Sequence, residues 1–140
     1  MTDTVSAGFL LIDKPSGWTS HDVVAKVRGL LRVKKVGHAG TLDPMATGLL
    51  PVVVGRATRL VRFLPGSPKV YEGRIRFGEV TDSDDVTGEV LSRHEGRLPS
   101  TEDVAAAADG FVGRQLQRPP SVSARKIGGK RMYRLAREGV

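Results

Sequence analysis

The sequence contains no cysteine and no long apolar run, and these two absences exclude several classes of protein. Without cysteine there is no disulfide scaffold, no thiolate zinc site, no iron–sulfur cluster and no cysteine nucleophile. The longest run free of polar or charged side chains lies around residues 49–54, and Pro51 interrupts it. Because a membrane-spanning helix needs about 20 apolar residues, we expect none.

Nucleotide-binding, metal-binding and targeting motifs are also missing. No glycine-rich phosphate-binding motif occurs, and the acidic run at residues 82–85 lacks the glycine and the final glutamate of a calcium-binding loop. The histidines are too scattered to predict a metal site. The N-terminus carries Asp3 and has no basic region before an apolar stretch, so we expect no signal peptide and a cytoplasmic protein.

Basic residues predominate, but they are unevenly distributed. The net charge is +7: residues 1–62 hold nine basic and four acidic side chains, residues 63–110 hold five and ten, and residues 111–140 hold eight and one. A basic surface attracts polyanions and makes phosphate contacts. It also helps to keep a protein in solution, so charge alone leaves nucleic-acid binding open.

Length and periodicity predict one α+β domain. The 140 residues are 39% hydrophobic and 26% charged, which is typical of a globular domain. Helices and strands follow one another without regular β-α alternation, which favours a mixed, mostly antiparallel sheet flanked by helices. The patterns predict strands over residues 8–13, 49–54, 69–77 and 89–92, a glycine-rich loop over 36–43, and an extended stretch over 115–127 followed by a turn at 128–129. They also predict four helices. The first runs from a cap at Ser20 to about residue 32, and a short one follows directly after Gly55. The third covers residues 104–111 and is preceded by a capping box of Ser100 and Asp103, and the fourth covers residues 132–137.

Two sets of side chains recur at regular spacing, and each set has an open interpretation. Arg56, Arg59 and Arg62 lie on one stripe of the short basic helix, where they fit either phosphate contacts or a solvated face. In the strand predicted over residues 69–77, Tyr71 shares its face with apolar side chains, as a buried core tyrosine does.

Residues 37–48 form the most unusual segment of the chain. Its three glycines permit a positive φ or a close approach of the backbone to a ligand. Pro44 keeps Asp43 out of the helical region, so the carboxylate projects from an extended loop. Such a carboxylate can act as a nucleophile or a general base. Equally, Asp-Pro commonly opens a type I turn with no chemical role.

The stretch GHAGTLDPMATGLL at residues 37–50 resembles the TruB family of tRNA pseudouridine synthases. The resemblance covers almost the whole chain, and the GHAGTLDP element is highly specific. Further similar stretches, in the same order, are DKPSGWTS at 13–20, KVY at 69–71, TDSDDVTG at 81–88, and QRPPS at 117–121 with Tyr133 beyond it.

This family isomerises the uridine at position 55 of the tRNA T-loop to pseudouridine. The resemblance therefore implies a pseudouridine synthase-like catalytic core whose partner is the T-arm stem-loop of tRNA. It implies no cofactor, no metal and no membrane partner, and we expect a monomer. Asp43 is implied to be the catalytic nucleophile that starts cleavage of the base–ribose bond. The freed uracil then rotates and rejoins through carbon, after the uridine has left its stack by base flipping.

The resemblance also implies substrate contacts beyond the nucleophile. A tyrosine stacks on the flipped base, a histidine fills the space that the base leaves in the T-loop, and two lysines touch phosphates or orient the pocket. Taken alone, the histidine would be a loop residue with a backbone partner, and each lysine a solvated surface side chain. The implied substrate-binding residues are Tyr71, His38, Lys14, Lys69, Gly40 and Thr41.

Members of the family are about twice as long as this sequence. The family's arginine that pairs with the catalytic aspartate lies downstream, together with the rest of the catalytic sheet and often an RNA-binding PUA domain. The resemblance thus makes residues 1–140 the N-terminal portion of a catalytic domain. For a chain without that arginine the alternative is a non-catalytic RNA-binding or tRNA-folding module. A basic α+β domain with no RNA role is a third hypothesis.

Overall fold

The computed structural model describes residues 7–64, 68–116, 126–127 and 130–131. Contacts divide the chain into two compact units, Met1–Tyr71 and Glu72–Val140. All described strand pairs are antiparallel, in agreement with the predicted α+β class. None of the helices in the described ranges is long and apolar enough to cross a membrane.

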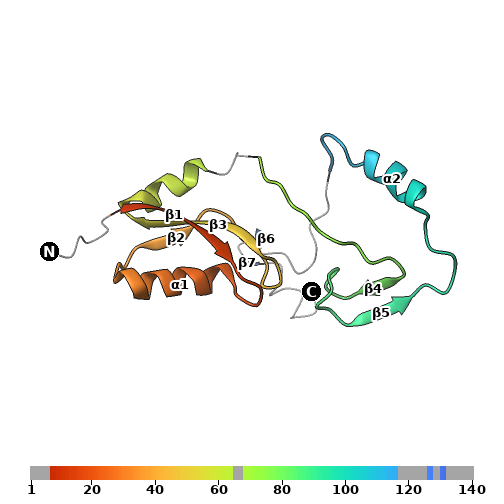
Figure 1. Ribbon diagram of the computed structural model, residues 1–140, viewed down its shortest axis with the longest axis horizontal. Helices are drawn as coiled ribbons and strands as arrows, with labels where there is room; N and C mark the ends of the chain where they lie inside the picture. Colours follow the sequence, from red (N-terminus) through yellow and green to blue (C-terminus); the bar gives the residue numbers. More distant parts are fainter. Residues whose placement is uncertain (1–6, 65–67, 117–125, 128–129, 132–140) are drawn as a thin grey trace. The chain divides into compact units, whose positions relative to one another are not determined.

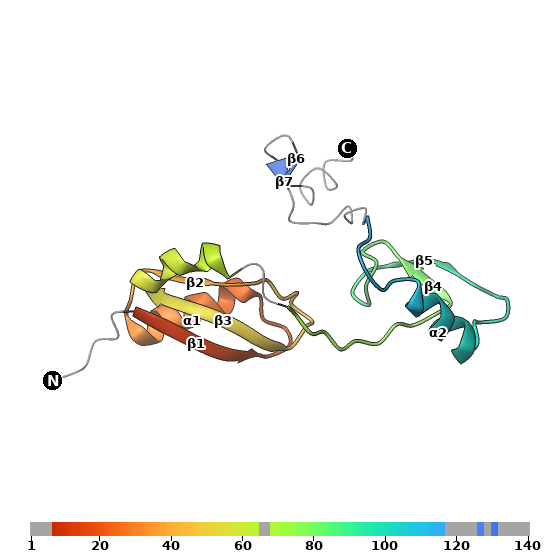
Figure 2. The same cartoon turned by 90° about the horizontal axis from the view of Figure 1, so that it is seen from above.

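The first unit has three layers around a three-stranded sheet of order β1–β3–β2. Helix α1 lies against one face of this sheet, and the 3₁₀-helix η1 lies against the other and contacts all three strands (Figures 1 and 2). The elements are β1 (Ala7–Lys14), α1 (Ser20–Leu31), β2 (Val36–His38), β3 (Gly48–Gly55) and η1 (Arg56–Phe63).

The core of this unit lies between α1 and the sheet. Helix α1 supplies three valines at helical spacing, and β3 supplies every second residue, because alternate side chains of a strand point to the same face. Burying each such side chain stabilises the fold by about 1.5–3 kcal/mol. The buried core side chains are Val23, Val24, Val27, Val36, Leu50, Val52 and Val54.

Local periodicity located most of these elements. The strands predicted over residues 8–13 and 49–54 and the short helix after Gly55 are confirmed. The loop predicted over residues 36–43 is wrong in its first part, because residues 36–38 form β2. The open edge of β3 offers backbone partners to this short strand, which pairs antiparallel with it.

The N-cap of α1 is Thr19 rather than the predicted Ser20. Thr19 has an extended backbone (φ −76°, ψ 158°), and its Oγ1 accepts a hydrogen bond from the Asp22 amide at 3.1 Å. The Asp22 carboxylate accepts one from the Thr19 amide at 2.8 Å, which completes a capping box. Ser20 is the first helical residue and is buried, so its hydroxyl is available for another loop.

The strand predicted over residues 69–77 is not formed, and this prediction is wrong. These residues have no regular structure, and the side chains of Tyr71 and Ile75 are 71% and 81% exposed. Alternation produces a strand only where a neighbouring strand supplies hydrogen bonds, and no described strand pairs with this segment. The interpretation of Tyr71 as a core tyrosine is therefore also wrong.

The described residues of the second unit form two antiparallel strand pairs and one helix. The strand predicted over residues 89–92 and the helix predicted over 104–111 are confirmed with shifted ends, and the capping box of Ser100 and Asp103 is present. Predictions for residues 117–125, 128–129 and 132–137 lie outside the described residues. The elements are β4 (Glu79–Thr81), β5 (Val90–Arg93), α2 (Thr101–Asp109), β6 (Lys126–Ile127) and β7 (Lys130–Arg131).

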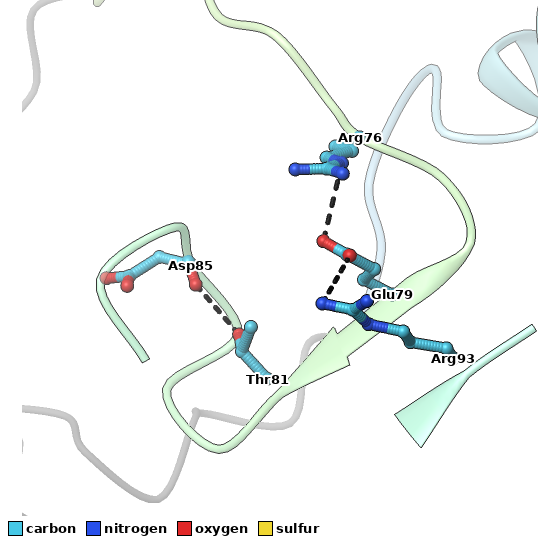
Figure 3. A network of polar contacts seen from close by, with 5 residues as sticks. All are labelled: Arg76, Glu79, Thr81, Asp85 and Arg93. Carbon is cyan, nitrogen blue, oxygen red and sulfur yellow. Dashed lines mark hydrogen bonds and ion pairs between the residues drawn. The ribbon is translucent and has the colours of Figure 1, made fainter. Parts of the chain in front are cut away.

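The acidic loop between β4 and β5 is held by its own polar groups. Thr81 Oγ1 donates to the carbonyl of Asp85 at 2.8 Å (Figure 3), and the Thr87 amide donates to Asp85 Oδ1 at 2.8 Å. Hydrogen bonds from Thr87, and then from Ser83, lower the pKa of the Asp85 carboxyl. The loop is therefore a structural turn held by its own side chains.

A small ion-pair network lies at the base of the same hairpin. Glu79 accepts from Arg76 at 3.3 Å and from Arg93, its cross-strand partner, at 3.4 Å (Figure 3). Exposed ion pairs of this kind contribute little to stability. The network thus helps to fix the register of the hairpin rather than forming a ligand site.

The capping box of α1 predicts a defined dependence of stability on pH. Hydrogen bonds from the Thr19 side chain and amide hold the pKa of the Asp22 carboxyl below its usual range. Because this pKa is lower in the folded than in the unfolded chain, its stabilising effect is complete above the unfolded value and is lost as pH falls through the folded one. We expect the unfolding free energies of the unmodified chain and of Asp22→Asn, measured with urea, to converge below about pH 4. A difference that stayed constant down to about pH 2 would contradict this assignment.

Candidate active site

Two loops meet at one end of the sheet, and together they form the candidate site. Residues 15–19 follow β1, and residues 39–47 connect β2 to β3. The two loops are neighbours because Lys14, the last residue of β1, pairs with Gly48, the first residue of β3. The sheet register therefore brings the Asp43 segment beside a loop about 30 residues earlier in the chain.

Asp43 lies at the start of a tight turn. The Ala46 amide donates to the carbonyl of Asp43 at 3.0 Å, so the Asp-Pro turn suggested by the sequence is present. Within the described part of the chain the turn uses only the backbone of Asp43, and the residue is exposed. The structural and the chemical interpretations are thus compatible, because the carboxylate stays free to meet a ligand.

The side chain of Lys14 forms hydrogen bonds to the main chain of both loops of the site. Its side chain is fully buried, and Nζ donates to the carbonyls of Trp18 at 2.7 Å, Pro15 at 3.0 Å and Pro44 at 3.3 Å. An ammonium has three donors, so these carbonyls satisfy it completely. No ion pair between Lys14 and Asp43 is present among the described residues. The lysine therefore organises the backbone of the loop, and its interpretation as a solvated surface residue is wrong.

Further hydrogen bonds from the first loop fix the backbone after Asp43. The Gly17 amide donates to the carbonyl of Pro44 at 2.7 Å, and Ser16 Oγ donates to the carbonyl of Met45 at 3.2 Å. Gly17 has φ +83°, a conformation that favours glycine, so a side chain here would strain the turn that presents this amide. No sequence pattern pointed to a role of Ser16 or Gly17 in the site, although both lie within the DKPSGWTS stretch.

Ser20 fixes the backbone before Asp43. Its Oγ accepts a hydrogen bond from the Leu42 amide at 3.0 Å and donates to the Leu42 carbonyl at 3.2 Å. Leu42 in turn packs against the hydrophobic core. The chain on either side of Asp43 is thus bound to the Lys14–Ser20 segment, while Asp43 itself is exposed.

His38 lies at the end of β2, next to the start of α1. Its Nδ1 contacts the carbonyl of Gly40, the backbone partner expected of a loop histidine. Its ring meets that of His21 edge to face, with 5.6 Å between centroids and an interplanar angle of 77°. No sequence pattern pointed to His21, because the two histidines are 17 positions apart in the chain.

The remaining predicted site residues differ in how the structure holds them. Gly40 and Thr41 are exposed on the same loop as Asp43, and Gly40 has φ +147°. Lys69 and Tyr71 are exposed in the segment that lacks strand partners, and no described hydrogen bond joins them to the Asp43 loop. Within the described ranges, no group of three or more acidic or histidine side chains could hold a metal.

Comparison with known proteins identifies close relatives. A family model described as TruB family pseudouridylate synthase (N terminal domain) matches residues 28–140. The chain is 54% identical over 134 residues to a protein named tRNA pseudouridine synthase B from a Synechococcus species. It is 52% identical over 132 residues to a protein of the same name from Thermobifida fusca.

These alignments cover nearly all of this chain but only part of each relative. They include 96% and 94% of the chain and 45% of each relative, so the chain spans about half the length of the curated relatives it matches. A crystal structure of a Cbf5–Nop10–Gar1 complex is also similar, with 32% identity and a TM-score of 0.60. That match covers 88% of this chain and 32% of the other.

Removing the Lys14 ammonium should loosen the site. Lys14→Met keeps an apolar stem but leaves the carbonyls of Trp18 and Pro44 without this donor. We expect the free energy of unfolding to fall by about 3 kcal/mol. Acrylamide should also quench Trp18, the chain's single tryptophan, more readily.

The matched control is Lys26→Met, which removes an exposed lysine of α1. It should change the unfolding free energy by less than about 0.5 kcal/mol. Equal stability and equal quenching in the two variants would refute the role given to Lys14.

Proposed function

Since the chain belongs to the TruB family of pseudouridylate synthases, we propose that residues 1–140 are the N-terminal portion of a catalytic domain that converts uridine in tRNA to pseudouridine. The identity of 54% to a protein named tRNA pseudouridine synthase B supports this substrate class. The target is the uridine at position 55, presented by the T-arm stem-loop. The protein acts on it in the cytoplasm as a monomer, with no metal and no cofactor.

Asp43 is the nucleophile of this reaction. Its attack starts cleavage of the bond between the ribose C1′ and N1 of uracil. The detached base rotates, and a ring carbon forms the new bond to C1′. That carbon loses its proton and N1 gains one, so no atom is gained or lost and no oxidant or reductant is needed.

The observation that carries this proposal is a free carboxylate on a fixed backbone. A nucleophile must stay within a fraction of an ångström of its productive position, which requires a supported main chain. Lys14, Gly17 and Ser20 supply that support through hydrogen bonds to Pro44 and Leu42. A target base that leaves its stack by flipping can reach an exposed carboxylate of this kind.

The other site residues act on the RNA around the reacting bond. Tyr71 stacks on the flipped base, and His38 fills the space left in the T-loop. Lys69 contacts a phosphate, while Lys14 acts indirectly by holding the Asp43 loop. Gly40 and Thr41 allow the RNA to approach the backbone of this loop closely.

A second candidate is a non-catalytic RNA-binding or tRNA-folding module. The observation that favours it is coverage: this chain corresponds to 45% of the relative from Synechococcus. By resemblance, the arginine that pairs with the catalytic aspartate lies outside that portion. A carboxylate without its cationic partner lacks the charge pairing that orients it.

Single-turnover pseudouridine formation on a T-arm stem-loop distinguishes the two candidates. Isomerisation leaves the mass unchanged, so the product is detected by carbodiimide labelling and primer extension. With the chain in excess, we expect a stop at the target uridine that is lost in Asp43→Ala and Asp43→Asn. Both variants should still bind the hairpin, because only the reacting carboxylate is altered.

Asp109→Ala is the matched control, since it removes an exposed carboxylate from the end of α2. It should leave the stop in place. Turnover by Asp43→Ala equal to that of the unmodified chain would overturn the assignment. A bound hairpin without product in any variant would instead identify this chain as the binding module.

A further inference from the structure

Two histidine rings meet beside the candidate active site, one from α1 and one from β2. His21 is exposed in the first turn of α1, and His38 is half-buried as the last residue of β2. Their ring centroids are 5.6 Å apart, and the interplanar angle of 77° makes the contact edge to face. In such a contact the positive edge of one ring meets the negative face of the other, so the pair has a preferred mutual orientation.

The main chain is fixed on both sides of this contact. A capping box holds the first turn of α1, and Ser20 Oγ is hydrogen-bonded to the backbone of Leu42. On the other side, β2 pairs with β3 and places His38 opposite Val52, which belongs to the core. Helix α1 also packs against β2. The fold therefore sets the positions from which the two side chains meet.

A backbone carbonyl holds the ring of His38 from a second direction. Its Nδ1 contacts the carbonyl of Gly40. A carbonyl oxygen only accepts hydrogen bonds, so Nδ1 must carry the proton. In a neutral imidazole the other nitrogen is then an acceptor, and Nε2 has no hydrogen-bond partner among the described residues. One acceptor of His38 is thus available to a ligand.

We propose that His21 is a positioning residue for His38, which it holds in the orientation and the Nδ1-protonated form that meet the T-loop of the RNA. The contact of His38 with the T-loop rests on the function proposed above. His21 has no part in the reaction itself and acts only through the ring of His38. Without the ring of His21 beside it, the side chain of His38 would have to be ordered by the RNA, at a cost in affinity.

The same assignment defines the chemical group that His38 recognises in the RNA. An unprotonated Nε2 accepts a hydrogen bond, whereas the oxygens of a phosphate are acceptors themselves. The matching group is therefore a hydrogen-bond donor of a nucleotide, which a base N–H or a ribose 2′-hydroxyl supplies. His38 contributes a directional contact of this kind rather than a positive charge.

Nuclear magnetic resonance of the free chain tests the positioning directly. The chain has 3 histidines, so its proton–nitrogen correlation spectra contain few imidazole signals. At about pH 8 an unperturbed histidine is neutral, and a protonated ring nitrogen is then distinguished from an unprotonated one. We expect His38 to be protonated on Nδ1 alone in the unmodified chain and to show a mixture of both tautomers in His21→Ala. His21→Phe returns an aromatic ring and should restore the single form.

Fluorescence anisotropy of a labelled T-arm hairpin tests the consequence for RNA binding by the full chain. His21→Ala should weaken binding about 3- to 10-fold, which corresponds to the cost of ordering one side chain. His21→Phe should bind as the unmodified chain does. In a His38→Ala background, His21→Ala should cause no further loss, because a positioning residue acts only through the ring that it positions.

The matched control is His94→Ala, which removes an exposed histidine from the second unit. It should change neither the tautomer of His38 nor the affinity for the hairpin. Thermal unfolding of each variant verifies that the fold is retained. A purely structural effect of His21→Ala would appear equally with and without His38, so the double variant separates it from positioning.

Three results would overturn the proposal. They are an Nε2-protonated His38 in the unmodified chain, an unchanged His38 tautomer in His21→Ala, and a loss of affinity from His21→Ala that persists in the His38→Ala background. Protonation of both nitrogens of His38 when the hairpin binds would overturn the contact with a donor group and indicate a phosphate instead.

The spectra of the free chain involve no RNA, so they decide the role of His21 separately from the proposed function. If the unmodified chain does not bind the hairpin, the proposed function fails, while the tautomer of His38 in His21→Ala still confirms or refutes the positioning. Product formation, in turn, tests Asp43 independently of both histidines.

Discussion

The geometry of the candidate site depends on one buried ammonium group. Removing a lysine head from water is costly unless every donor finds an acceptor. Lys14 meets this condition through three backbone carbonyls, one of which belongs to Pro44 on the other loop. The acceptors are main-chain atoms, so the lysine fixes the path of the chain rather than the charge of a side chain. Its own position is set by β1, whose pairing with β3 places it opposite Gly48.

In this arrangement the groups that hold the Asp43 loop in place are different from the carboxylate that is available for chemistry. Backbone groups on either side of Asp43 are used in hydrogen bonds to residues 14–20, while its carboxylate is exposed. A carboxylate on a rigid turn is prepared for a ligand without needing a rearrangement of the loop. By contrast, Lys69 and Tyr71 lie in a segment without strand partners. These two residues therefore lack the backbone support that the described residues give to Asp43.

The electrostatic potential of the charged side chains extends over longer distances than the hydrogen bonds of the candidate site. Residues 63–110 carry an excess of acidic side chains, and the carboxylates of Asp82 and Asp85 in the β4–β5 loop accept hydrogen bonds within their own turn. Helix η1 carries cations only, aligned by its 3₁₀ geometry. A polyanion is therefore attracted to the first unit and disfavoured near the acidic loop.

The sequence by itself determined the features that depend on neighbours along the chain. Apolar periodicity located β1, β3 and α1, the Ser100 capping box located α2, and the motif around Asp43 identified the family. Only the tertiary structure decided the burial of Lys14, the bond from Ser20 to Leu42, and the failure of residues 69–77 to form a strand. The physical reason is that each depends on a partner remote in sequence, 30 positions away for Lys14 and Pro44. The presence of such a partner decides whether a lysine is buried or solvated. It also decides whether an alternating segment becomes a strand. Patterns of neighbouring residues contain no information about a partner so far away in the chain.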